Sequence, residues 1–270
     1  MSFSVSGKTA IITGAANGIG LAIARHFVAQ GANVMLADMD ETKLAEEVEQ
    51  LGGDGDSKAQ FFAGDLREKL TQANLLSATL DAFDRVDILV NASRQLVTSD
   101  PLDLDDNTLV NMLEQNLTTG YRLSQTVARK MISQAKSSEE KSGAVGTIVN
   151  ISSIASQRIH PDLLAYSVST AALDQLTRSM ALVLAKHNIR VNTVAFGSMM
   201  SESLRTALVD QDVKRDEITE NTPLGRIASP SEIVETVQFL ASDASGFMTG
   251  QIVTVDGGRT LMDSVETAAH

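Results

Sequence analysis

A glycine-rich turn near the N-terminus has the composition of a phosphate-binding loop. Gly14, Gly18 and Gly20 stand in the segment Gly-Ala-Ala-Asn-Gly-Ile-Gly, between an apolar run and an amphipathic one. Glycines permit a tight turn and let a pyrophosphate approach the backbone, and the following helix offers free N–H groups and a partial positive charge. With Asn17 and Ile19 completing the loop, we predict a dinucleotide site here; the alternative is an ordinary start of a helix.

Asp38 stands at the end of the next apolar run. A carboxylate at this place accepts hydrogen bonds from the 2′- and 3′-hydroxyls of an adenosine ribose, and it repels a 2′-phosphate. No Arg or Lys lies in the glycine loop or directly after Asp38. The sequence therefore predicts NAD(H) rather than NADP(H). In the alternative interpretation Asp38 only begins a turn, with Asp40 capping the next helix, and both interpretations can hold together.

Seven short apolar runs alternate with amphipathic segments along the chain. The elements that they form would position the glycine loop and Asp38. Continuous apolar runs are typical of strands buried on both faces of a parallel sheet. Repeated strand–helix alternation indicates right-handed crossovers. We predict an α/β protein with one doubly wound, mostly parallel seven-stranded sheet flanked by helices, in a single domain over residues 1–270. The expected strands are 8–13, 32–37, 60–63, 86–90, 147–151, 190–195 and 252–255.

The amphipathic segments predict six helices with apolar residues at helical spacing. Their apolar positions span 19–27, 44–51, 76–83, 109–128, 166–184 and 233–240. In the fourth segment, Leu109, Leu113 and Leu117 would begin the buried face of one long helix.

The composition excludes several classes of function. The absence of cysteine excludes disulfides and thiolate catalysis, and four histidines without a His-Glu-x-x-His pattern give no reason to expect a metal. A formal net charge of −12 argues against nucleic acid as a partner. No signal-peptide pattern and no apolar run of roughly 20 residues occurs, so we expect a cytoplasmic protein that does not enter a membrane.

Over nearly its whole length the chain resembles the short-chain dehydrogenase/reductase family. That family implies a Rossmann fold and hydride transfer between a nicotinamide dinucleotide and an alcohol or ketone. The resemblance is carried by the Thr-Gly-x-x-x-Gly-Ile-Gly loop, Asp65-Leu66, Asn116, Ser152-Ser153 and Tyr166, and by the motifs at 189–192, 223–226, 240–243, 249–251 and 255–258.

The resemblance implies roles for residues in three of these motifs. In such enzymes a tyrosine exchanges the proton, a serine polarises the substrate oxygen and an asparagine supports a water relay. Tyr166, Ser153 and Asn116 match by position, and Ser153 precedes Tyr166 by the usual 13 residues. Ser152 points to the other side of its strand and is expected to be structural. Further cofactor contacts are implied for Asp65, Leu66, Asn91 and Gly197.

The chain departs from the family pattern at three places. The family has a lysine four residues after the tyrosine, which holds the nicotinamide ribose and favours the ionised tyrosine; here it is Thr170. A threonine on the same helix face as Tyr166 donates one hydrogen bond, worth about 1 kcal/mol. A free tyrosine has a pKa of about 10, so oxidation of an alcohol should be slow at neutral pH. Thr170 stays a candidate catalytic residue because it occupies the place of the lysine.

The other two departures follow the fourth and sixth strands. Asn91-Ala-Ser-Arg94 replaces the usual Asn-Asn-Ala-Gly, and Phe196-Gly replaces Pro-Gly. Arg94 could supply the missing positive charge. We favour a surface position for it, with an ion pair to Asp100 or Asp103, because arginine is usually exposed.

Residues 197–222 are the expected substrate lid. Met199, Met200, Leu204, Leu208 and Val209 suit an apolar ketone or alcohol, or they simply pack an amphipathic helix against the domain. The family also implies a homotetramer or homodimer, built from the long helices near 109–131 and 166–184.

Two hypotheses remain open for the function. The first is an NAD(H)-dependent oxidoreductase of secondary alcohols or ketones, with a small-molecule substrate. The second is a catalytically impaired NAD(H)-binding protein that serves as a structural or sensing subunit, because the departures cluster at the catalytic end while the glycine loop and Asp38 are intact.

Overall fold

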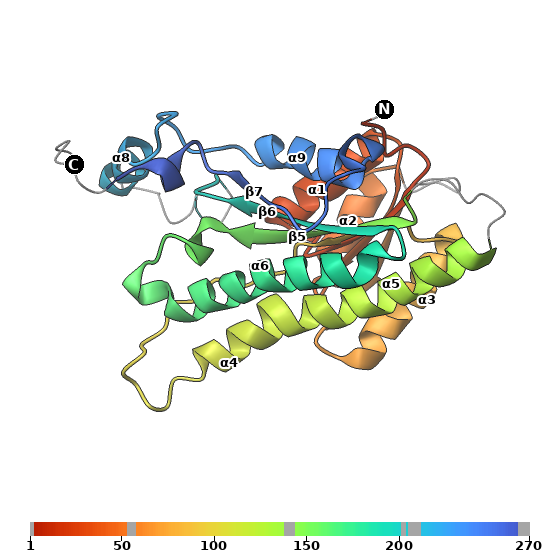
Figure 1. Cartoon of the computed structure of the whole chain (residues 1–270), viewed down its shortest axis with the longest axis horizontal. Coiled ribbons are helices and arrows are strands. Elements are labelled where there is room, and N and C mark those ends of the chain that lie inside the picture. Colours follow the sequence, from red (N-terminus) through yellow and green to blue (C-terminus); the bar gives the residue numbers. More distant parts are fainter. Residues whose placement is uncertain (1–2, 53–57, 138–143, 201–203, 205–211, 264–270) are drawn as a thin grey trace.

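The computed structural model describes residues 3–52, 58–137, 144–200, 204 and 212–263. Within these residues the chain forms one seven-stranded sheet in which all strand pairs are parallel. The strand order is β3-β2-β1-β4-β5-β6-β7, with helices on both faces (Figure 1). The predicted doubly wound fold is confirmed.

The seven strands begin and end within two residues of the predicted bounds. β1, β4, β5 and β6 are buried along their whole length, which explains why they read as continuous apolar runs. The strands are β1 (Thr9–Thr13), β2 (Asn33–Asp38), β3 (Ala59–Ala63), β4 (Ile88–Asn91), β5 (Gly146–Ser153), β6 (Ile189–Phe196) and β7 (Ile252–Val255).

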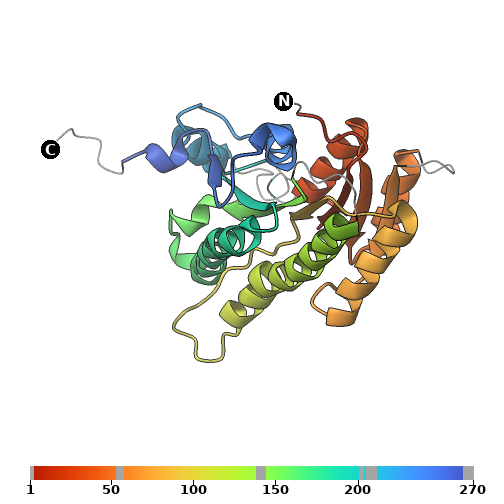
Figure 2. The ribbon, with the colours of Figure 1, turned by 45° about the vertical axis from the view of Figure 1, so that its right-hand side comes forward.

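Three helices cover each face of the sheet. α1 (Gly18–Ala29), α2 (Glu41–Gln50) and α9 (Ser231–Ala241) pack on one face. α3 (Lys69–Phe83), α5 (Thr119–Ser137) and α6 (Leu164–Ala185) pack on the other. Figure 2 shows α3, α5 and α6 side by side below the strands, with α1 and α9 above them. Short 3₁₀ turns occupy Ile154–Ser156, Pro161–Leu163, Asp243–Ser245 and Arg259–Leu261.

Helix α3 buries a different face from the one predicted. The leucines expected inside, within 76–83, are only partly buried, while Gln72 and Leu75 lie in the core. The Gln72 side chain donates to the backbone carbonyls of Leu66 at 2.6 Å and Thr119 at 3.2 Å. A polar side chain is stable in the core when its hydrogen bonds are satisfied. The spacing of the apolar residues therefore did not identify the buried face of α3 correctly.

The long helix predicted from 109 onwards is divided in two. α4 (Thr108–Leu113) and α5 are joined by a π-helical turn, Glu114–Thr118. The wider turn shifts the helical register, as single π turns do, often at functional sites. Asn116 consequently points inward and is buried, whereas Leu109, the first residue of the predicted apolar face, is exposed.

The lid is described only in part. α8 (Asp212–Glu220) forms its C-terminal part, Met199 is buried and forms a backbone bridge with Ala228, and Leu204 is half-buried. The predicted lid residues Leu208 and Val209 lie outside the described residues. No helix in the described part of the chain is both long enough and apolar enough to cross a membrane.

Candidate active site

The candidate residues lie at the edge where the parallel strands end. The chain order reverses between β1 and β4, and ligands bind open parallel sheets at such a switch point. Thr13 and Asn91 end these two strands. Ser153 and Phe196 end β5 and β6, where they are direct neighbours in the sheet register. The fold therefore places residues from four strand ends around one crevice.

The glycine loop leaves no room for side chains at two of its positions. A Cβ atom on Gly20 would lie 2.6 Å from the carbonyl carbon of Gly14, with the Gly14 carbonyl oxygen closer still. A Cβ on Gly14 would lie 2.8 Å from the Cα of Ser93, and Gly14 has a left-handed φ of +67°. The loop is thus packed backbone against backbone, between α1 and the segment after β4.

The first turn of α1 keeps its amide groups available for an anion. Asn17 is the residue before the helix, and its side chain makes no capping hydrogen bond. Ile19 points away into the core and anchors the turn. Free N–H groups at a helix start, beside a loop in which glycine is required, fit a dinucleotide pyrophosphate.

Asp38 lies next to this loop. Its carboxylate accepts hydrogen bonds from the backbone N–H of Ala16 at 3.2 Å and of Met39 at 2.7 Å. Asp38 is half-buried, so a negative charge stands where the adenosine ribose would lie in such a fold. The capping role predicted for Asp40 is confirmed, because its side chain accepts from the N–H of Lys43 at 3.1 Å.

Asp65 and Leu66 follow β3. The Asp65 carboxylate forms an ion pair with Arg67 at 2.6 Å, and the Arg67 hydrogen bonds lower the pKa of Asp65. Leu66 is buried and lines a small cavity beside Tyr166. Contact of either residue with a cofactor stays a prediction.

Asn91 and Gly197 support the crevice from two strands. The Asn91 side-chain amide donates to Ser124 Oγ at 2.9 Å and to Asn150 Oδ1 at 2.8 Å. Its own Oδ1 has no partner among the described residues, and Asn91 borders the cavity. A Cβ on Gly197 would lie 3.1 Å from the Cβ of Asp256. Both residues hold neighbouring segments close together.

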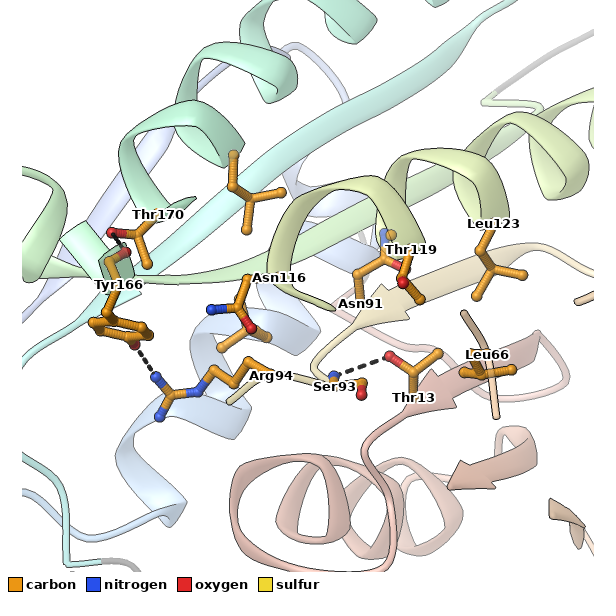
Figure 3. Close-up of a pocket in the computed structure, with 13 residues that line it drawn as sticks. Thr13, Leu66, Asn91, Ser93, Arg94, Asn116, Thr119, Leu123, Tyr166 and Thr170 are labelled. Atoms are coloured by element: carbon orange, nitrogen blue, oxygen red, sulfur yellow. Dashed lines mark hydrogen bonds between the residues drawn. The ribbon is translucent and has the colours of Figure 1, made fainter. Parts of the chain in front are cut away.

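Tyr166 is buried near the start of α6, and Arg94 reaches it from the segment after β4. Arg94 Nη1 donates a short hydrogen bond to Tyr166 Oη (Figure 3). The guanidinium carbon also lies 4.3 Å from the centre of the Phe196 ring. The described residues include no acid paired with Arg94, so the surface ion pair with Asp100 or Asp103 that we favoured from the sequence is wrong.

Thr170 does not contact the phenol oxygen through its hydroxyl. The Thr170 Oγ1 donates to the backbone carbonyls of Tyr166 and Ser167, both at 3.0 Å. This hydroxyl is therefore used within its own helix, which is common for threonine in helices. Thr170 lines the cavity together with Tyr166, where it contributes shape but no charge.

Asn116 connects the π-helical turn to the segment after β4. Its Oδ1 accepts from the N–H of Gln95 at 2.8 Å, and its Nδ2 donates to the Gln95 carbonyl at 2.9 Å. Nδ2 also lies 3.2 Å from Ser169 Oγ on α6. The amide group thus fixes the residue that follows Arg94.

Ser153 ends β5 and is mostly buried. Its Oγ accepts from the N–H of Ala155 at 3.2 Å and so begins the 3₁₀ turn Ile154–Ser156. This bond uses a lone pair and leaves the hydroxyl proton available to another acceptor. Ser152 is fully buried, in agreement with its expected structural role.

Two further residues shape the site, and the sequence analysis gave them no role in it. Thr13 Oγ1 accepts from the N–H groups of Ala92 and Ser93, both at 3.0 Å (Figure 3). Gln115 Nε2 donates to Ser93 Oγ at 3.1 Å. Thr13 immediately precedes the glycine loop, and this position in the sequence could have indicated its role in the site.

Comparison with known proteins identifies the family. Residues 14–260 match the family model described as enoyl-(acyl carrier protein) reductase. The 7α-hydroxysteroid dehydrogenase of Escherichia coli K12 is 34% identical over 261 residues, which cover 94% of both chains. The chain belongs to the short-chain dehydrogenase/reductase family. These relatives are oxidoreductases, and membership of the same family makes this chain an oxidoreductase as well.

Two solved structures with similar folds contain nicotinamide cofactors. A 7α-hydroxysteroid dehydrogenase complexed with NADH and 7-oxo glycochenodeoxycholic acid has a TM-score of 0.85 and 30% identity, covering 95% of each chain. A gluconate 5-dehydrogenase from Burkholderia cenocepacia, in complex with NADP and tartrate, has a TM-score of 0.85 and 31% identity, covering 97% of this chain and 98% of that one. The family thus includes members that bind each form of the cofactor.

Proposed function

We propose that this protein is an NAD(H)-dependent oxidoreductase that interconverts a secondary alcohol and a ketone. The carrying observation is the buried Tyr166, whose phenol oxygen accepts a hydrogen bond from Arg94 on the segment that packs against the glycine loop. Such an arrangement suits proton exchange with a substrate oxygen. We further propose that residues 1–270 form one domain of this kind, with a lid at about 197–222.

The preference for NAD(H) rests on Asp38. Its carboxylate lies against the glycine loop and accepts hydrogen bonds, as ribose hydroxyls can supply, whereas a 2′-phosphate would meet a like charge. Gly14, Gly18 and Gly20 would admit the pyrophosphate, with Asn17 and Ile19 setting the first turn of α1. Asn91 and Gly197 would border the nicotinamide end, and Asp65 with Leu66 the adenine end.

The protein's own residues would divide the chemistry as follows. When bound, the cofactor accepts or supplies a hydride at C4 of its nicotinamide. Ser153 would donate a hydrogen bond to the substrate oxygen and orient it. Tyr166 would give a proton to that oxygen during reduction and take one from it during oxidation. Reduction thus adds one hydride and one proton to the ketone, and oxidation removes both from the alcohol.

An apolar substrate is favoured by the residues around the crevice. Phe196 ends β6 and Met199 follows shortly after it, and both are buried, while Leu204 is half-buried in the described part of the lid. Apolar walls with few polar groups are typical of sites for small organic ligands. The names of similar proteins range from a hydroxysteroid to gluconate, so they support an alcohol or ketone without choosing its type.

Turnover tests the proposal directly. We expect NADH oxidation with at least one member of a panel of cyclic and aliphatic ketones, and loss of that activity in Tyr166→Phe. The Ser153→Ala variant should lose activity with unchanged NADH affinity. If NADH binds but no ketone or alcohol in the panel reacts, the impaired NAD(H)-binding subunit becomes the better account.

Assembly and location remain predictions. Exposed apolar side chains on α4 and α6, among them Val110, Leu182 and Val183, would suit a homotetramer or homodimer. Light scattering coupled to gel filtration would measure the mass in solution, and a monomer would contradict this prediction. A cytoplasmic location and a small-molecule substrate, rather than nucleic acid or membrane, are proposed on charge and composition alone.

A further inference from the structure

The three departures from the family pattern meet at one place. Thr170 lies one helical turn after Tyr166, and Arg94 reaches the Tyr166 phenol oxygen (Figure 3). The Arg94 guanidinium also lies over the ring of Phe196. The positions that differ from the family are therefore in contact or joined through one tyrosine. This arrangement indicates replacement of the lysine by another group rather than simple loss.

Arg94 is suited to carry a charge at this position. The residue is half-buried, and in the described part of the chain no carboxylate forms an ion pair with it. An aromatic ring at 4.3 Å attracts a guanidinium without neutralising it. Arginine also stays protonated across the pH range in which a protein is folded, so its charge is constant.

The backbone on both sides of Arg94 is fixed by hydrogen bonds. Ser93 is held through its N–H by Thr13 Oγ1 at 3.0 Å. Gln95 is held through its N–H and its carbonyl by Asn116, at 2.8 and 2.9 Å. A catalytic group is effective only if a second set of residues holds it in its productive geometry. Asn116 provides that here, from a π-helical turn that directs it inward.

We propose that Arg94 is the catalytic cation of this enzyme and that Asn116 is its positioning residue. Arg94 stabilises the negative charge on Tyr166 Oη, which forms when the phenol gives its proton to a ketone oxygen and which must exist beforehand to remove a proton from an alcohol. The guanidinium has five N–H donors, so others remain for a substrate hydroxyl. The proposal rests on the proposed function for its kinetic consequences only.

The composition of the chain allows a test that needs no turnover. The protein has two tyrosines and no tryptophan, so Tyr121→Phe leaves Tyr166 as the single source of phenolate absorbance. In this background we expect the phenolate to appear at lower pH with Arg94 than with Arg94→Met, by about one pH unit, the smaller end of the effect of an opposite charge within about 4–6 Å. Arg94→Lys should lie close to the parent protein, because it keeps the charge.

Equal phenolate midpoints for Arg94 and Arg94→Met would overturn the proposal. If the Met variant does not fold, Arg94→Gln replaces it, with near-ultraviolet circular dichroism as the check on folding. For the positioning role, Asn116→Ala should move the midpoint towards that of Arg94→Met. The exposed Asn107→Ala is the matched control at the start of α4, and it should leave the midpoint unchanged.

Kinetics then connects the charge to catalysis. Arg94→Met should lower alcohol oxidation at pH 7 on the order of 100-fold, with recovery towards pH 10 and unchanged NADH affinity. Adding Thr170→Lys to Arg94→Met should restore activity at pH 7, because it returns a cation from the family's own position. A pH profile identical to that of the parent would refute a catalytic role. If no variant turns over, but the phenolate midpoint still depends on Arg94, the proposed function fails and the electrostatic role stands.

Discussion

Replacement of Gly20 by alanine tests how closely the structure of the glycine loop matches a dinucleotide cradle. The new Cβ would lie 2.6 Å from the carbonyl carbon of Gly14 and 2.9 Å from the Thr13 oxygen, whereas ordinary contacts begin at 3.4 Å. The backbone must therefore separate by more than 0.8 Å, the difference between 3.4 and 2.6, because the Gly14 carbonyl oxygen lies closer still. Overpacking of this kind costs about 1–3 kcal/mol. The gain from alanine in the first turn of a helix, about 1 kcal/mol, offsets only part of it.

The displaced atoms belong to the turn that would receive the pyrophosphate, so binding should suffer more than folding. We expect Gly20→Ala to weaken NADH at least about tenfold, equivalent to about 1.4 kcal/mol, in a calorimetric titration. Gly7→Ala is the matched control, because Gly7 has a left-handed φ of +74° and open space around its Cβ, away from the loop. It should lower the melting temperature and leave NADH affinity unchanged. An unaltered NADH affinity in Gly20→Ala would refute the reasoning.

Three further predictions follow from charges in the structure. Asp38→Ser should weaken NADH and raise the ratio of kcat/KM with NADPH to that with NADH, and an unchanged ratio would remove Asp38 from cofactor selection. Burial raises the pKa of Asp174, so the protonated native state is fully stable below the ordinary pKa of 3.8 and loses stability as pH rises above it; Asp174→Asn should therefore melt at a higher temperature than the parent at pH 8 and at the same temperature at about pH 3. The hydrogen bonds from Arg226 lower the pKa of Glu232 to about 2. That carboxylate therefore contributes stability above its unfolded value of 4.5, which is lost as pH falls towards 2. Glu232→Gln should lower the melting temperature at pH 7 and have no effect at pH 2, and a constant difference would contradict the ion pair.

Much of the fold could be predicted because its determinants are local. Buried parallel strands require continuous apolar runs, and the tight turn after β1 requires glycine, so both are visible in the sequence. The inward faces of α3 and of the π-helical turn could not be predicted in the same way. They bury Gln72 and Asn116, whose hydrogen-bond partners come from other elements, and the spacing of apolar residues alone does not show which polar side chains are buried.

The identity of the candidate catalytic residues could be predicted from the sequence, but the contacts between them could not. Tyr166 and Ser153 were placed by their spacing. Arg94 was assigned to the surface because arginine is usually exposed. Its partner lies 72 residues further along the chain, and only the folded sheet brings the two together. From the sequence we expected the Thr170 hydroxyl to donate a hydrogen bond in the catalytic site. In the structure it donates to backbone carbonyls of its own helix instead.

The central claim is that the glycine loop and Asp38 select a dinucleotide without a 2′-phosphate. Titration calorimetry of the purified protein with NADH and with NADPH, at the same ionic strength, measures this most directly. We expect heat of binding and a clearly tighter dissociation constant with NADH. Tighter binding of NADPH, or no heat with either cofactor, would contradict the account.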